Sequence, residues 1–145
     1  MNPKIGSIIA FLVAVAGVLF LFYRNYIFSF NPVTIFIQVF SMGLMIWARF
    51  TFGIRSFHAA ANTTRGELVT NGPYRWLRHP IYASLIYFFS ASVIAYPFLE
   101  TVIGFVMISV GLFVRMILEE KYLNERYKEY AAYSKNTKRV IPYLF

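Results

Sequence analysis

The sequence predicts an all-α integral membrane protein, a single domain over residues 1–145 with four transmembrane helices. Hydrophobic residues make up 59% of the chain and charged residues only 14%, and the mean hydropathy of +0.57 is too high for an ordinary soluble domain. Four apolar runs approach the length of about 20 residues that a helix needs to cross a bilayer. The polar residues are concentrated in one loop and in the C-terminal tail.

The first two spans follow from long apolar runs near the N-terminus. Residues 5–23 lie between Lys4 and Arg24. Because this run continues well past the small residues at 14–16, an uncleaved anchor fits it better than a signal peptide. Residues 33–52 form the second span, in which Arg49 lies near the end and can extend to the interface.

The third span is predicted to begin at a proline. Pro80 suits the first position of a helix, because its missing N–H would have no partner there, and this places His79 at or next to the N-cap. Residues 81–98 then form the third span. The polar residues 53–80 before it form the longest connection and a natural place for a cofactor-binding loop.

The fourth span, residues 101–118, follows so closely that the third and fourth helices are predicted to form a tight antiparallel hairpin. Gly104 and Gly111 lie two turns apart on one face, where small residues let helix backbones approach. The charged, tyrosine-rich tail at 119–145 suits a C-terminal interfacial helix that continues from this span and ends near Asn136.

The distribution of positive charge predicts the orientation. If the N-terminus, the middle loop and the tail share one side of the membrane, that side holds all but one of the 14 Lys and Arg residues. The positive-inside rule then predicts that both termini are cytoplasmic. The formal charge of +8 fits this bias, with contact to anionic lipid headgroups, better than it fits nucleic acid.

Several classes of site are excluded or disfavoured. The chain has no cysteine, so it has no disulfide, thiolate metal site or cysteine nucleophile. It has no GxGxxG and no P-loop pattern, and with His58 and His79 as its two histidines and no HExxH, a metal site is not expected.

Two stretches could carry chemistry. Residues 72–82 place Arg78 and His79 at a helix start, which favours an anion. Arg115 and Glu119 form an i, i+4 pair at the end of the fourth span, with Glu120 beside it. Taken alone, each also fits a plainer role: a helix cap for His79, an interfacial ion pair for Arg115. Together, cations at one helix start, carboxylates at a helix end and aromatic rings between them suit a zwitterionic, aromatic cofactor.

These stretches resemble two methyltransferase families. Residues 68–70 lead to Gly72-Pro73-Tyr74 and then to residues 78–82, and a second pattern follows in order and spacing. Its members are Arg115, Glu119, Glu120, Leu123, Tyr127, Tyr130, Tyr133, Arg139 and Pro142. Both patterns resemble the isoprenylcysteine carboxyl methyltransferase and phospholipid methyltransferase families. The resemblance covers little more than the second half of the chain.

The resemblance implies S-adenosylmethionine as the methyl donor. His79 and the helix start would suit its carboxylate, Glu119 or Glu120 its ammonium or ribose hydroxyls, and Tyr74 or Tyr82 its adenine or sulfonium. Arg115 would face the acceptor, and Arg115 and Glu119 would be catalytic. The implied cofactor-binding residues are Gly66, Glu67, Leu68, Val69, Tyr74, Arg78, His79, Pro80, Ile81, Tyr82, Glu119 and Glu120.

The acceptor stays open among a prenylated cysteine carboxylate, a phospholipid amine and a small thiol, all lipidic or amphiphilic. Ser84 stands where many relatives have glycine, which could change the pocket or a helix contact, and Lys128 replaces a glycine in the tail. Two alternatives are a nicotinamide-dependent reductase, since sterol-reductase-like proteins share a similar C-terminal pattern, and a non-enzymatic membrane module.

Overall fold

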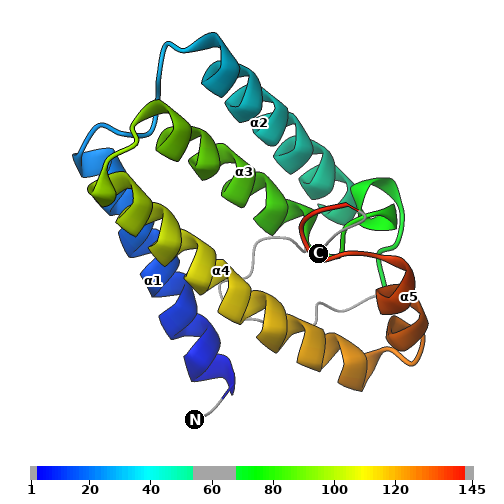
Figure 1. Cartoon of the computed structure of the whole chain (residues 1–145). Coiled ribbons are helices and arrows are strands. Elements are labelled where there is room, and N and C mark those ends of the chain that lie inside the picture. Colours follow the sequence, from blue (N-terminus) through cyan, green and yellow to red (C-terminus); the bar gives the residue numbers. More distant parts are fainter. Residues whose placement is uncertain (1–2, 54–67, 143–145) are drawn as a thin grey trace.

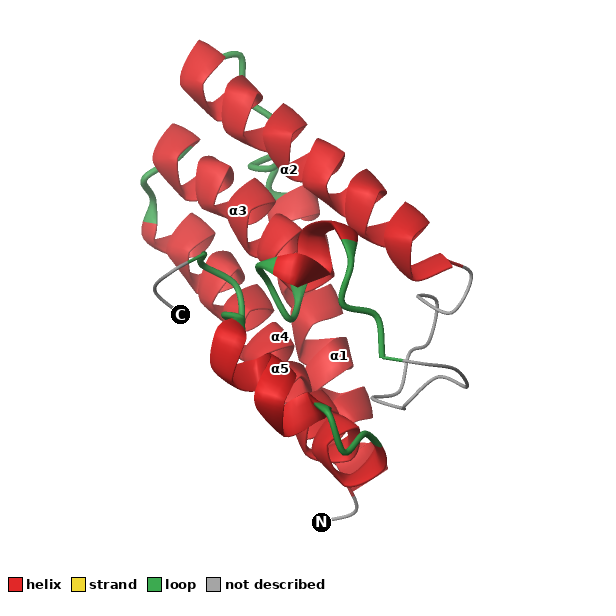
Figure 2. Ribbon diagram, turned by 90° about the vertical axis from the view of Figure 1, so that its right-hand side faces the viewer, coloured by secondary structure: helices red, strands yellow, loops and turns green. Residues whose placement is uncertain are grey.

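The computed structural model describes residues 3–53 and 68–142 (Figure 1), and all regular secondary structure in these residues is helical (Figure 2). Three helices are long and apolar enough to cross a membrane, and the fourth main helix, with 16 residues, is shorter. The helices are α1 (Pro3–Tyr23), α2 (Pro32–Phe52), the 3-10 helix η2 (Gly72–Arg75), α3 (Pro80–Ala95), α4 (Leu99–Arg126) and α5 (Tyr130–Asn136). The predicted all-helical class is confirmed, while a fourth complete span stays a prediction.

Two helix starts follow directly from proline. Pro32 opens α2, and the side chain of Asn31 caps it by accepting a hydrogen bond from Val33 N at 2.9 Å. Pro80 opens α3 with His79 at the N-cap position, as predicted. The His79 side chain makes no capping hydrogen bond, so its ring is available for other partners.

The long helices associate as two pairs (Figure 1): α1 packs along α4, and α2 packs along α3. α3 and α4 are joined by the short connection at residues 96–98 and contact each other, but each packs more extensively against its main partner, so the tight antiparallel hairpin predicted for them stays a prediction. α1 begins, α2 ends, α3 begins and α4 ends on one side of the molecule.

Glycine lets α1 and α4 approach closely. A Cβ atom added at Gly104 would lie 2.6 Å from Leu21 Cδ2, and one at Gly111 would lie 2.5 Å from the Ala10 carbonyl oxygen. Gly17 on α1 is equally tight, 2.8 Å from the Gly104 carbonyl oxygen. The predicted close approach at these glycines therefore occurs, and α1 is the helix that fills it.

The ends of α3 and α4 differ from the predicted spans. α3 ends at Ala95 rather than at 98, and α4 contains the predicted 101–118 and continues to Arg126. At 1.5 Å per residue α4 is about 42 Å long, more than a hydrocarbon core of about 30 Å, so its charged end projects beyond it. The helix predicted to continue from this span is interrupted, because Tyr127 is extended (φ −112°, ψ 113°) and separates α4 from α5, while the last helix does end at Asn136, as predicted.

The chain after α5 returns to the start of α3. Leu77 and Lys138 form an isolated parallel bridge, Arg78 N donates to Lys138 O at 2.7 Å, and Lys138 N donates to Trp76 O at 3.1 Å. The Tyr133 hydroxyl adds a bond to Tyr74 O at 2.7 Å. The C-terminal segment is thus fixed beside the turn that leads into α3.

Candidate functional site

The two stretches singled out in the sequence meet in space. The His79 ring lies between two carboxylates of α4, with Nε2 3.3 Å from Glu120 Oε1 and Nδ1 3.8 Å from Glu119 Oε2. His79 is buried, and both carboxylates are largely shielded from solvent. Residues 41 positions apart thereby share one polar cluster at the cytoplasmic end predicted from charge.

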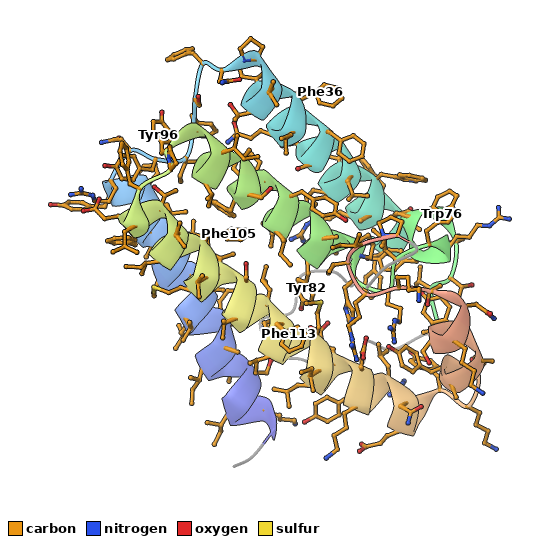
Figure 3. The ribbon with its side chains drawn as sticks, in the orientation of Figure 1. Phe36, Trp76, Tyr82, Tyr96, Phe105 and Phe113 are labelled. Carbon is orange, nitrogen blue, oxygen red and sulfur yellow. The ribbon has the colours of Figure 1, made fainter. Side chains whose placement is uncertain are left out.

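Glu119 forms the first half of this cluster with Arg115 and Tyr82. The Tyr82 hydroxyl donates to Glu119 Oε1, Arg115 Nη2 lies 3.3 Å from the same oxygen, and Arg115 Nε donates to the Tyr82 hydroxyl at 3.1 Å. Figure 3 shows Tyr82 on the side of α3 that faces α4. The predicted i, i+4 pair is therefore present and extends into a three-residue network across two helices.

Arg115 is an unusually enclosed cation, with only 4% of its surface exposed. Its guanidinium carbon lies 5.4 Å from the centre of the Phe11 ring and 5.9 Å from that of Tyr82. A cation buried at this depth needs a negative partner and is further stabilised by aromatic faces. Glu119 supplies the charge, and α1 and α3 supply the rings.

Glu120 forms the second half and binds three different donors. Arg78 Nη1 lies 3.2 Å from Oε1, and His79 Nε2 lies near the same oxygen. Arg139 donates from Nε to both carboxylate oxygens, at 3.1 and 3.2 Å, and from Nη2 to Oε2 at 2.9 Å. This forked geometry is the arrangement in which arginine holds a carboxylate most firmly.

The electrostatics of the tail reflect this cluster. The hydrogen bond to the Glu120 carboxylate raises the pKa of Arg139 above its usual value, so its charge is secure. Burial raises the pKa of Tyr130 to about 12, and the nearby negative charge of Glu120 adds to the shift. Tyr130, which is 3% exposed, is therefore a neutral phenol at physiological pH.

The local sequence explains why His79 and Tyr82 act together. Pro80 starts α3, so His79 lies just outside the helix and Tyr82 in its first turn, three residues later on the same side. Their rings stack with centroids 5.6 Å apart and an angle of 18° between the planes. One face of the cluster is thus a flat aromatic surface beside two carboxylates.

The charge balance of the cluster indicates what it can bind. Three guanidinium groups, those of Arg78, Arg115 and Arg139, face two carboxylates, which leaves one net positive charge without counting His79. Such a site suits a ligand with an anionic group and, opposite Glu119, a cationic or hydroxyl group. In the part of the chain that the structure describes, no group of three His, Asp or Glu side chains is placed to hold a metal ion.

The other predicted site residues have contacts that do not by themselves indicate a ligand. Tyr74 is buried and packs on Phe52, with ring centres 5.5 Å apart, and Pro80 and Ile81 form the first turn of α3. Leu68 and Val69 are half-buried at the start of the second described segment. Gly66 and Glu67 lie outside the described residues.

Two contributors could not be found from the motifs in advance. Phe11 is one of many apolar residues of the first span and carries no signal that sets it apart. Arg139 belongs to the C-terminal pattern, but nothing in its spacing indicates Glu120 as its partner. Both depend on how distant segments pack.

Of the two departures from the family pattern, Ser84 faces α2 rather than the cluster. Its hydroxyl donates to Ile81 O at 2.7 Å and lies 3.7 Å from Met45 Sδ. Lys128 is exposed between α4 and α5. Ser84 also borders an apolar cavity of about 300 Å³ between α2 and α3, lined by Phe28, Ser41, Met42, Met45, Ser84, Leu85, Phe88 and Phe89.

Comparison with known proteins gives a family match. The family model described as phospholipid methyltransferase matches residues 32–130, a range that holds His79, Tyr82, Arg115 and both glutamates but neither α1 nor Arg139. No curated protein and no solved structure matches the chain. Since the matched range covers well over half of the 145 residues, the protein belongs to the phospholipid methyltransferase family.

Proposed function

We propose that this protein transfers a methyl group from S-adenosylmethionine to a lipidic or small amphiphilic acceptor. The observation that carries the proposal is the meeting of His79 and Tyr82 with Arg115 and Glu119 at one end of the helices. Family membership supports a membrane methyltransferase. The cofactor and the acceptor are inferred.

The chemistry of the cluster fits the proposed cofactor. S-adenosylmethionine, when bound, supplies a methyl group on a positively charged sulfur. Arg78, His79 and the start of α3 would hold its carboxylate, and Glu119 or Glu120 would accept from its ammonium group or ribose hydroxyls. Tyr82 and Tyr74 offer aromatic faces for the adenine or the sulfonium. Gly66, Glu67, Leu68 and Val69 would complete the site from the loop side.

The residues of the cluster would act mainly by positioning. Methyl transfer requires the donor sulfur, the methyl carbon and the acceptor atom in line, and fixed geometry is the main source of acceleration in such a reaction. The Tyr82, Arg115 and Glu119 network is held by two helices and is largely buried, so it can fix groups and exclude water. Arg115 is the residue we assign to the acceptor side, where a cation would orient a carboxylate or phosphate.

The proposal is tested by binding and transfer in one preparation. In calorimetry on detergent-purified protein, S-adenosylhomocysteine should bind, and NADPH should not displace it. Labelled S-adenosylmethionine should then label one class among total membrane lipid, prenylcysteine and thiol acceptors. Displacement by NADPH would favour the reductase alternative, and no binding of either compound would refute the proposed enzyme.

A further inference from the structure

The two neighbouring glutamates of α4 have different surroundings, which suggests different roles. Glu120 contacts Arg78, His79 and Arg139, and 12% of its side chain is exposed. Glu119 is more open, with 23% of its side chain exposed. In the described residues, its Oε2 lies 3.8 Å from His79 Nδ1, longer than a hydrogen bond.

Arg139 holds His79 from two directions. Its carbonyl oxygen accepts from His79 N at 3.1 Å, and its guanidinium binds both oxygens of Glu120, whose Oε1 contacts the His79 ring. These contacts form a closed ring of Arg139 main chain, His79, Glu120 and Arg139 side chain. The neighbouring main-chain bonds between residues 76–78 and Lys138 keep the C-terminal segment in register with the turn.

We propose that Glu120 and Arg139 are positioning residues that form a clasp on His79, and that Glu119 is the glutamate that meets the bound ligand. Glu120 has its oxygens committed to three cationic or ring donors, so a ligand ammonium or hydroxyl would have to displace one of them. Glu119 Oε2 has a place for such a donor. The assignment of Glu119 to a ligand depends on the proposed function; the clasp on His79 does not.

The clasp also implies a structural role for the C-terminal segment that carries Arg139. Arg139 lies outside the range matched by the family model, yet it contacts the same carboxylate as Arg78 and His79. Without the Arg139 side chain, Glu120 would keep only the guanidinium of Arg78, and the carboxylate that contacts the His79 ring would be less firmly held. His79 should then occupy several orientations, and a ligand that needs one of them should bind more weakly.

The orientation of His79 can be measured directly, because the chain contains only two histidines. In protein with ¹³C-labelled histidine and the background substitution His58→Asn, the ring signals belong to His79. Arg139→Gln should shift or broaden these signals, and Glu120→Gln should do the same. Lys135→Gln, an exposed cation of the same tail, is the matched control and should leave them unchanged.

Affinity separates a clasp from a direct ligand contact. Arg139→Gln and Glu120→Gln should each weaken S-adenosylhomocysteine binding about threefold to fivefold. The double variant should lose no more affinity than the single variant with the larger loss. Arg139→Lys should recover part of the loss, since lysine restores the charge without the fork. Glu119→Gln should cost at least tenfold.

Unchanged His79 signals in both Arg139→Gln and Glu120→Gln would overturn the clasp, as would losses of affinity that multiply in the double variant. A loss at Glu120→Gln larger than that at Glu119→Gln would overturn the division of roles. If Glu120→Gln fails to fold, Arg139→Gln, whose side chain is 30% exposed, still decides the signal test. A wild-type protein that binds no S-adenosylhomocysteine would refute the proposed function, whereas the His79 signals would still judge the clasp.

Discussion

Tyr82 is the single residue that connects the two helices of the cluster. Its hydroxyl donates to Glu119 and accepts from Arg115, while its ring stacks on His79. The sequence left open whether this tyrosine belongs to an interfacial aromatic belt or to a site. Its contacts support the second interpretation, because a belt tyrosine would direct its hydroxyl to water.

The first prediction therefore concerns this hydroxyl. Tyr82→Phe keeps the stacked ring and removes a hydrogen bond to a charged group, worth about 1.5–3 kcal/mol. We expect at least a tenfold loss of S-adenosylhomocysteine affinity in calorimetry. Tyr96→Phe, which removes a hydroxyl bonded to Phe28 O at the other end of the molecule, is the control and should bind normally. Equal affinity of wild type and Tyr82→Phe would exclude a role for this network in binding.

Thr101 leads to a second prediction, on stability. It is fully buried in the first turn of α4, and its hydroxyl has no hydrogen-bond partner among the described residues. Thr101→Val has nearly the same shape and removes the cost of burying an unpaired polar group. Thermal unfolding in detergent should occur at the same temperature or a higher one. A clear fall in that temperature would show that the hydroxyl is paired.

At the level of elements, the lengths of the apolar runs were predictable but their partners were not. Lipid-facing and helix-facing positions are equally apolar in a membrane, so hydropathy does not distinguish them. Gly104 and Gly111 indicated one face for close contact, yet only the structure shows that α1 fills it. The ion pair between Arg24 and Glu100, which joins the end of α1 to the start of α4, likewise could not be predicted from the sequence.

The contact between α1 and α4 yields a third prediction. Gly104→Leu places a side chain where Leu21 already lies and should force the two helices apart. We expect a loss of stability of about 1–3 kcal/mol, or more, as for other overpacked sites. Gly43→Leu is the matched control, because nothing lies within 4 Å of a Cβ at that position. Equal unfolding temperatures for the two variants would mean that α1 and α4 do not pack as described.

The sequence predicted which chemical groups the candidate site contains, but not which side chains contact each other there. The residue types indicated an anion site at the start of α3 and two carboxylates near the end of α4, and these two groups of residues do meet in the structure. The division between Glu119 and Glu120 depends on Arg139, which the chain brings back through a break at Tyr127 that contains neither proline nor glycine. Main-chain bonds between residues 76–79 and 138–139 carry no side-chain signature.

At the scale of the whole molecule, the clustering of charge at one end predicts the orientation in the membrane. The polar cluster, η2 and α5 lie at that end, and the Arg24 and Glu100 pair lies at the other. The native chain has no cysteine, so single cysteines report without background. The Lys135→Cys variant should react with an impermeant maleimide from the cytoplasmic side alone, and the Phe30→Cys variant, at a position that is 99% exposed, from the opposite side alone. Labelling of both from one side would contradict four spans.

A cofactor site shared by His79 and Glu119 is tested most directly by measuring the affinity for S-adenosylhomocysteine of the purified wild-type protein and of the His79→Ala and Glu119→Ala variants. His79 precedes α3 and Glu119 belongs to α4, and their side chains meet at 3.8 Å, so a shared site predicts that either substitution weakens binding. We expect a loss of at least tenfold in each, about 1.4 kcal/mol, with Lys135→Ala unchanged. Wild-type affinity in both variants would contradict a cofactor site between the start of α3 and the end of α4.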